Sequence, residues 1–186
     1  MNLLLHVCCG PCSIYPLSRL RQQNIEVSGY FYNPNIHPFQ EFRRRLASLR
    51  DFANESDFHI EIDTEYGLTE YLQQVVFHEK ERCPLCYAMR LEKTAKYGIE
   101  IGAEAFSTTL LYSRFQNHEA IVGIGTTMAE KYGIAFHYED FREGWQEGID
   151  KSIAMDLYRQ PYCGCIYSEQ ERYDKKLRKK LKTSSI

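Results

Sequence analysis

Residues 3–23 read LLLHVCCGPCSIYPLSRLRQQ, and this stretch decides the fold. The short apolar run 3–7 stops at two cysteines, which is typical of a buried strand. Pro11 stands where the first turn of a following helix would begin, and residues 13–23 carry the helical pattern. A buried strand that passes through a tight turn into a helix is the repeating unit of α/β proteins.

The same alternation continues along the chain. Apolar runs predict further strands at 27–32, 58–62, 105–110 and 135–138, and helical patterns cover 40–56, 68–78, 85–101 and 119–132. The remainder is mostly helical, with an interruption at 160–165. Neither a repeat nor a break in composition divides the chain. We therefore predict one α/β domain over residues 1–186, a parallel sheet with helices on both faces, which ends in a basic and helical tail at 172–186.

Polar residues and cysteines follow the predicted strands at the point where each strand ends. They are Cys8 and Cys9, residues 33–37, Asp63, residues 108–113 and Asp140, in strand order. The carboxyl ends of parallel strands meet at one edge of a sheet, and α/β proteins bind their ligands there. The sequence therefore predicts one functional site at this edge.

Seven cysteines in 186 residues suggest a disulfide scaffold, but three observations argue against it. The number is odd, a chain of this length buries roughly 70% of its surface without cross-links, and the first residues lack the pattern of a secretory signal. No stretch approaches the ~18 apolar residues of a membrane span. We expect a cytoplasmic protein without a membrane partner, in a reducing compartment where clustered cysteines serve metal binding or catalysis.

The formal net charge of −2 hides two local groups of basic residues. Residues 43–45 are three consecutive arginines, and the tail from Arg172 onward is rich in lysine and arginine. A locally basic surface suits a polyanionic partner such as RNA. For the tail, a solvated and frayed terminal helix explains the same composition equally well.

The cysteines form three groups that lie far apart in the sequence. The groups are Cys8-Cys9-Gly10-Pro11-Cys12, Cys83-Pro84-Leu85-Cys86 and Cys163-Gly164-Cys165. Two thiolates on one turn can bind one metal or adjacent irons, and a pair from another loop closes a four-thiolate site. An iron–sulfur cluster or a structural zinc would use such a site. We expect the cluster, because the side chains of neighbouring cysteines diverge, which does not suit tetrahedral zinc.

Two of these groups leave a choice open. Cys12 lies close to one helical turn past Cys9, and we expect it to be a buried helix residue. Cys163 and Cys165 could close into a strained disulfide of the redox-active kind, since Gly164 supplies the backbone freedom that so small a ring needs. The same two thiols could instead bind a metal. We favour the redox pair.

Five ordered motifs between Leu4 and Ser168 are specific when they are taken together. They are CCGPC at 8–12, YNPNIHP at 32–38 with Glu41 and Arg44, CPLCY at 83–87 with Arg90 and Leu91, FSTTLL at 106–111, and YRQPYCGC at 158–165. With these motifs the chain resembles the QueH family of epoxyqueuosine reductases. One departure is Arg114, because the family pattern leads us to expect proline after Ser113.

The resemblance implies a fold related to the adenine-nucleotide α-hydrolase-like group and an oxidoreductase of tRNA modification. Such an enzyme reduces epoxyqueuosine at the wobble position of tRNA to queuosine, the last step of that pathway, without cobalamin. The partner would be tRNA that bears epoxyqueuosine in its anticodon, with an electron donor that the resemblance does not identify. A [4Fe–4S] cluster would be held by Cys8, Cys9, Cys83 and Cys86. Cys163 and Cys165 would be the redox-active pair or ligands to an additional iron ion.

Removing the epoxide oxygen as water consumes two electrons and two protons and leaves an alkene. A second redox store is therefore useful, and either the CxC pair or an additional iron acting as a Lewis acid would serve. A general acid must protonate the leaving oxygen. The candidates, which follow predicted strand ends, are His37, Glu41, Asp63 and Asp140.

Recognition of the wobble base needs aromatic or guanidinium planes for stacking, and phosphates need basic side chains. Our aromatic candidates are Tyr32, Tyr112 and Tyr162, chosen from a wider group beside the motifs that includes Phe115. Ser107 and Thr108 offer hydroxyls to phosphate or ribose, unless they only continue the strand. The other predicted substrate contacts are Asn33, Arg44, Arg90 and Arg159.

Two other classes of protein compete with this interpretation. An ATP-dependent tRNA thiolase has the same fold type, but it carries a Ser-Gly-Gly-x-Asp-Ser phosphate loop after the first strand. Here that position reads Cys-Cys-Gly-Pro-Cys, with one glycine. A zinc-stabilised RNA-binding module is the other alternative, and it would be colourless where an iron–sulfur protein is brown.

Overall fold

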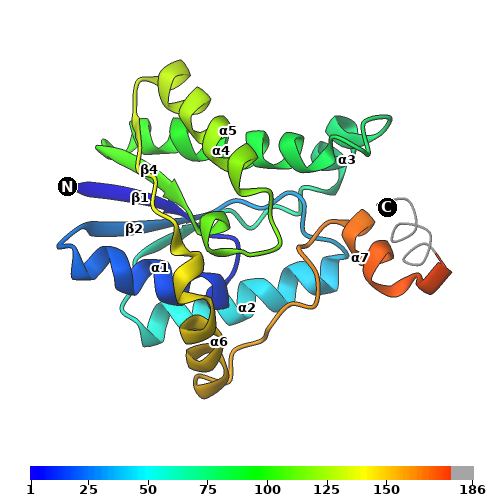
Figure 1. Ribbon diagram of the computed structural model, residues 1–186, viewed down its shortest axis with the longest axis horizontal. Helices are drawn as coiled ribbons and strands as arrows, with labels where there is room; N and C mark the ends of the chain where they lie inside the picture. The colour runs from blue at the N-terminus through cyan, green and yellow to red at the C-terminus, as the bar shows by residue number, and fades with distance from the viewer. Residues whose placement is uncertain (177–186) are drawn as a thin grey trace.

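Strand β1 (Asn2–His6) lies at the centre of the sheet. The computed structural model describes residues 1–176, and in them five strands pair in the order β3-β2-β1-β4-β5. The other strands are β2 (Glu26–Phe31), β3 (Ile60–Ile62), β4 (Ala105–Thr108) and β5 (Ala135–Phe136). All the pairings are parallel, so the carboxyl ends of the strands lie at one edge of the sheet (Figure 1).

The leucine run of β1 forms the middle of the hydrophobic core. Leu3, Leu4 and Leu5 are fully buried, and they pair with residues 27–29 of β2 and 105–107 of β4. Both faces of a parallel sheet are covered by helices, so a central strand reads as a continuous apolar run. Each buried leucine contributes roughly 1.5–3 kcal/mol to folding.

Helices form a layer on each face of the sheet (Figure 1). One face is covered by α1 (Gly10–Gln22), α2 (Phe39–Glu55) and α6 (Trp145–Ala154), and the other by α4 (Arg82–Glu100) and α5 (His118–Tyr132). Helices α3 (Leu68–Val75) and α7 (Ile166–Tyr173) lie toward the carboxyl edge (Figure 1). Two 3-10 turns, η1 (Thr109–Tyr112) and η2 (Phe141–Gly144), connect the layers at β4 and α6.

This architecture confirms the predicted α/β class: a single domain, a parallel sheet and helices on both faces. Each predicted strand and helix is present, with ends displaced by a few residues. The order of strands reverses between β1 and β4, which is the arrangement of doubly wound folds. Such a reversal opens a crevice beyond the carboxyl ends of the two strands, and β1 leads into it at Cys8.

Two boundaries differ from the prediction for local reasons. The predicted strand 105–110 ends at Thr108, because the Thr108 hydroxyl accepts a hydrogen bond from the Leu110 amide and starts η1. Helix α4 begins at Arg82, so Cys83 and Pro84 lie inside its first turn and not before it. Proline is tolerated there, since amides of the first turn have no intrahelical partner.

The predicted tail falls only partly within the described residues. Helix α7 ends at Tyr173, and Lys175 and Lys176 follow it. The predicted helix over the rest of the tail lies outside the described residues. Within residues 1–176, no helix combines the length and the apolar character that a membrane crossing needs.

Candidate functional site

Three thiols gather where β1 ends and α1 begins. The Sγ atoms of Cys8, Cys9 and Cys12 all lie within 4.8 Å of one another. Cys9 caps α1, because its Sγ accepts a hydrogen bond from the Cys12 amide at 3.4 Å. Within residues 1–176 no other set of three potential metal ligands lies so close together. We expected Cys12 to be a buried helix residue; it is a half-buried residue of α1, and its thiol lies close to those of Cys8 and Cys9.

Two segments distant in sequence hold this three-thiol group. The Thr109 hydroxyl, at the end of β4, accepts from the Cys8 amide at 3.0 Å and lies 3.3 Å from the Cys8 sulfur. The Gln160 side-chain amide donates to Cys9 Sγ at 2.9 Å and to Cys12 Sγ at 3.4 Å. The group therefore sits between β1 and β4, at the reversal of strand order, where a doubly wound fold binds its ligand.

Hydrogen bonds between the three sulfur atoms shift the pKa values of the three thiols in different directions. Contacts from Cys12 and Cys9 lower the pKa of Cys8, while the contact with Cys8 raises the pKa of Cys12. Burial raises the pKa of Cys9. The three thiols thus share protons, and a bound metal would displace those that remain.

A second group of thiols forms at the start of α4. Cys86 and Cys165 pack in one buried cluster with Tyr71 and Val75. Burial raises the pKa of Cys83, and it raises the pKa of Cys86 to about 11. The Cys163 thiol contacts Cys165 and lowers the pKa of Cys165 to about 4. The structure therefore brings the CxC segment to the second group, and it describes all seven cysteines as free thiols.

Arg90 links the two thiol groups electrostatically. Its side chain is only 4% exposed, with Nη1 at 3.6 Å from Cys86 Sγ and 3.3 Å from Asn35 Oδ1. The positive charge of Arg90 also lowers the pKa of Cys8, although the contacts with Cys12 and Cys9 and the burial of Cys8 have larger effects on this pKa. Nη2 is buried and has no hydrogen-bond partner among the described residues. We predicted that Arg90 contacts a phosphate of the substrate, and in this structure its side chain is buried.

His6 lies beside Arg90 and helps to orient it. Its Nδ1 lies 2.9 Å from the Thr108 hydroxyl, and its Nε2 lies 3.5 Å from Arg90 Nε. Burial lowers the pKa of His6 to about 3, so the imidazole is neutral at physiological pH. A neutral ring adds no second positive charge beside the guanidinium, and its Nε2 also lies 3.2 Å from the Tyr32 carbonyl, to which it can donate.

A buried ion pair fixes the CxC segment. Arg45 is 2% exposed, and its Nε donates to Glu41 at 2.7 Å. Its Nη1 donates to the Cys163 carbonyl and its Nη2 to the Tyr162 carbonyl, each at 2.9 Å. The second carboxylate oxygen of Glu41 accepts from the Tyr158 hydroxyl at 2.6 Å. Both oxygens of the predicted acid Glu41 are thus occupied, an arrangement that positions the segment.

His37 lies beneath the same segment with its ring nitrogens unoccupied. The His37 amide donates to the Gly164 carbonyl at 2.8 Å, and the Tyr162 hydroxyl donates to the His37 carbonyl. The ring packs against Tyr66 and Tyr71. It is 1% exposed, and neither ring nitrogen has a partner among the described residues. Burial lowers the pKa of His37, so the free ring is neutral.

Replacing Gly164 with alanine is expected to destabilise the protein by at least about 1 kcal/mol. Gly164 has φ +136, and a Cβ would lie 3.0 Å from the Asn35 amide nitrogen and 3.2 Å from Arg45 Nη1. Urea unfolding measures the change. Gly123→Ala is the matched control, since its Cβ would enter open space on α5 and should stabilise the helix by about 0.5–1 kcal/mol. Equal stability of the two variants would contradict the described conformation.

The other two predicted acids lie apart from the thiols. Asp63 lines a separate hollow of about 260 Å³ with Tyr30 and Lys93. Asp140 is held by Arg142, whose hydrogen bonds lower the pKa of Asp140 to about 2. A carboxyl group ionised at neutral pH is a poor proton donor, so the site does not support Asp140 as the general acid.

Most of the predicted substrate contacts are buried. Arg44 and Arg159 are exposed and Tyr162 is half-buried, whereas the buried members are Tyr32, Asn33, Ser107, Thr108 and Tyr112. Several have internal partners: Tyr32 donates to Glu70 at 2.6 Å, Asn33 to the Val7 carbonyl at 2.8 Å, and Tyr112 to the Trp145 carbonyl at 2.9 Å. In this conformation these buried side chains support the site from within.

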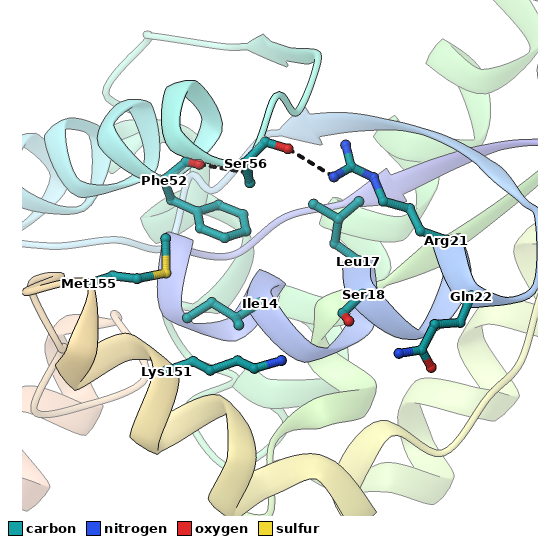
Figure 2. A pocket seen from close by; sticks show the side chains of 9 residues that line it. All are labelled: Ile14, Leu17, Ser18, Arg21, Gln22, Phe52, Ser56, Lys151 and Met155. Carbon is teal, nitrogen blue, oxygen red and sulfur yellow. Dashed lines mark hydrogen bonds between the residues drawn. The ribbon is translucent and has the colours of Figure 1, made fainter.

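A surface hollow lies elsewhere, between α1, α2 and α6 (Figure 2). Its volume is about 490 Å³. The lining side chains are Ile14, Leu17, Ser18, Arg21, Gln22, Phe52, Ser56, Lys151 and Met155. None of them is a thiol or a carboxylate, so this hollow offers no ligand to a metal.

The donor set of the two thiol groups fits a thiolate-bound metal group. Cysteine sulfur is the ligand of iron–sulfur clusters and of many zinc sites. Side-chain donors from Thr109 and Gln160 already reach the sulfur atoms, as expected for the surroundings that tune such a group. Sequence analysis did not single out Gln160, Arg45 or His6, although Gln160 lies within the YRQPYCGC motif.

Together these features define a doubly wound α/β protein whose site, at the reversal of strand order, is built from buried thiols. The model of the family described as epoxyqueuosine reductase QueH matches residues 3–171. The chain belongs to that family and is an oxidoreductase, as its motifs predicted.

Curated relatives agree with this assignment, and one solved structure shares the fold. A QueH epoxyqueuosine reductase of Dehalococcoides mccartyi is 40% identical over 94% of this chain and 96% of its own. The corresponding protein of Thermotoga maritima is 37% identical over 94% and 93%. A predicted tRNA methyltransferase subunit from Methanocaldococcus jannaschii superposes with a TM-score of 0.53 at 11% identity, over 100% of this chain and 88% of that one. That likeness concerns the fold alone.

Proposed function

We propose that this protein reduces epoxyqueuosine at the wobble position of tRNA to queuosine, without cobalamin and with an iron–sulfur centre. The observation that carries the proposal is the pair of thiol groups, one after β1 and one at the start of α4, in a chain of the QueH family. The seven thiols of these groups lie beside a core already filled by leucine and phenylalanine, so a structural task does not account for them.

The centre is proposed to be a [4Fe–4S] cluster. Cys8 and Cys9 at the end of β1 and Cys83 and Cys86 on α4 are the ligands that the resemblance predicts. Cys12 is a fifth thiol within reach of the first two, and four are enough for such a cluster. When bound, the cluster supplies electrons one at a time. The surrounding side chains hold the substrate and move protons.

Arg90 is proposed to stabilise negative charge at the centre. It lies beside Cys86, it is buried, and its Nη2 has an unused donor. A buried cation whose position is fixed by Asn35 and His6 stabilises an anion without having to reorganise. The leaving epoxide oxygen and the thiolates are the anions that this chemistry produces.

Cys163 and Cys165 are proposed to act as the second redox store. Cys163 is exposed and Cys165 is buried beside Cys86. Closing a disulfide between them releases two electrons and two protons, and conversion of an epoxide to an alkene and water consumes the same number. An external reductant must then reopen the disulfide. Arg45 and Glu41 position this pair, and His37, with both ring nitrogens unoccupied, is the candidate that relays a proton.

The first test is an anaerobic assay of iron-reconstituted protein with epoxyqueuosine-containing tRNA and dithionite, in the absence of cobalamin. Mass spectrometry of the nucleosides is expected to show queuosine. Cys86→Ala is expected to lower conversion at least about 100-fold, since removing one member of a catalytic centre typically costs this much. Ile153→Ala, a change at an exposed position on α6, is the control that should retain full conversion.

Each other result assigns a different function. No conversion by a brown, cluster-loaded protein would overturn the reductase proposal, and ATP binding measured by calorimetry would then point to a thiolase. A colourless protein that contains zinc and binds RNA would identify the RNA-binding module.

A further inference from the structure

An exposed aromatic cluster borders the three-thiol group. The indole of Trp145, at the start of α6, stacks on Tyr112 with ring centroids 5.2 Å apart. Phe115 stands edge-on to the same indole at 5.4 Å and 80°. The Arg114 guanidinium lies over the indole at 5.9 Å. Phe115 is 84% exposed, so a large apolar ring faces solvent while the cluster beneath it holds it in place.

The charges around this cluster favour an anionic partner. Arg114 and Arg159 are both exposed, and neither forms an ion pair within the described part of the chain. The Arg114 guanidinium donates only to the Arg142 carbonyl, at 3.3 Å. Of the carboxylates nearby, Asp140 pairs with Arg142 and Glu147 with Lys151, while Glu143 accepts a hydrogen bond from the Tyr15 hydroxyl.

The cluster is continuous with the thiol site. Tyr112 ends η1, the turn that begins at Thr109, and Thr109 contacts Cys8. Burial raises the pKa of Tyr112, and the nearby thiols of Cys12 and Cys9 raise it further. On the other side, Arg159 directly precedes Gln160, which contacts Cys9. The charges of Arg159 and Arg114 both lower the pKa of Tyr112, so the two arginines and the aromatic cluster lie beside the three-thiol group.

We propose that Phe115, supported by Trp145 and flanked by Arg114 and Arg159, is a stacking platform for an unpaired nucleobase of the anticodon loop. This inference rests on the proposed function, because it takes the substrate to be a tRNA loop. A base next to the reacting nucleotide would stack on Phe115, and the arginines would contact the adjoining phosphates. Unpaired bases bind proteins in this way, on aromatic planes within a basic surface.

Arg114 brings both a charge and a planar group to this platform. Its guanidinium lies over the only tryptophan of the sequence. A protein partner would gain little from the cation, whereas a nucleic acid gains a phosphate contact.

The single tryptophan makes a direct test possible. The probe is an unmodified anticodon stem–loop RNA, which needs neither the epoxide nor electrons in order to bind. It is expected to quench the fluorescence of Trp145 in the cluster-loaded protein. A blunt duplex with the stem sequence and no loop should leave the fluorescence unchanged. Equal quenching by loop and duplex would overturn the platform.

Variants of Phe115 separate stacking from simple apolar contact. Phe115→Ala and Phe115→Leu are each expected to weaken binding of the stem–loop about tenfold, because one stacked base is lost. Phe115→Tyr keeps an aromatic plane and should bind like the unaltered protein. Arg114→Gln should reduce the slope of log affinity against log salt concentration by about one, which is the contribution of one phosphate contact. If Phe115→Leu binds as tightly as the unaltered protein, stacking is excluded.

Failure of the platform and failure of the proposed function give different results. A protein that reduces its tRNA but binds the stem–loop equally well with alanine at position 115 would overturn the platform alone. Loop-dependent quenching that is lost in Phe115→Ala, in a protein without reductase activity, would support the platform and overturn the reductase.

Discussion

Replacing Cys83 with alanine is expected to remove most of the bound iron, to less than about a tenth of the unaltered content, whereas Cys12→Ala should keep it although the Cys12 thiol is close to two of the proposed ligands. The Cys12 sulfur lies within 4.8 Å of those of Cys8 and Cys9, and Gln160 donates to both Cys9 and Cys12. Loss of Cys83 removes one of the four proposed thiolate ligands and with it a large part of the metal-binding free energy. Iron and acid-labile sulfide per chain, measured after anaerobic reconstitution, check this result.

The matched control is Cys163→Ala, because Cys163 is exposed and belongs to the CxC segment. It should retain the iron even where activity is lost. Loss of iron in Cys12→Ala, together with full iron in Cys83→Ala, would contradict the four proposed ligands and place Cys12 at the metal instead.

Replacing Arg45 with methionine is expected to destabilise the protein by about 3–5 kcal/mol, because it leaves the Glu41 carboxylate buried without its partner. The melting temperature should fall by roughly 10 °C. The Cys163 and Tyr162 carbonyls lose their donors in the same variant. Thermal unfolding followed by circular dichroism measures the first effect.

Two further variants distinguish the positioning of the CxC pair by Arg45 from the contribution of Arg45 to stability. Arg43→Met alters an exposed arginine of the same run and should change stability by less than about 0.5 kcal/mol. Arg45→Lys keeps the charge but cannot donate to both carbonyls at once. If Arg45 positions the CxC pair, Arg45→Lys should change the alkylation rate of Cys163 while the protein remains folded. An unchanged alkylation rate would restrict Arg45 to a structural role.

The fold was predictable because its strongest signals are local. The leucine run 3–5, the proline at 11 and the alternation of strands with helices each depend on residues close together in the sequence. The rule that places a site at the carboxyl ends of parallel strands then located the first cysteines correctly. Helix α4 was predicted to start too late, because proline at 84 suggests a boundary and is also tolerated within a first turn.

The details of the site depend on tertiary contacts that no local pattern reports. Residues 43–45 are three arginines with the same local surroundings, yet two are exposed and Arg45 is buried against Glu41. A charged residue is normally expected at the surface, so composition predicted a basic patch. Arg90 was predicted to contact a phosphate, and it is buried as well. Phe115 belonged to a group of aromatics that the sequence could not rank by exposure.

The strap formed by residues 158–165 has a consequence for the order of events during synthesis. It joins Gln160 to the thiols at positions 9 and 12, and it brings Cys165 to Cys86. Chains emerge from the ribosome with the N-terminus first. The thiols at positions 9 and 12 are therefore synthesised long before the strap that contacts them. Until the strap is made, the growing chain presents open thiols to solvent. Iron delivered to a nascent chain would therefore reach open thiols. Iron delivered to the finished protein would instead reach thiols that the strap already contacts.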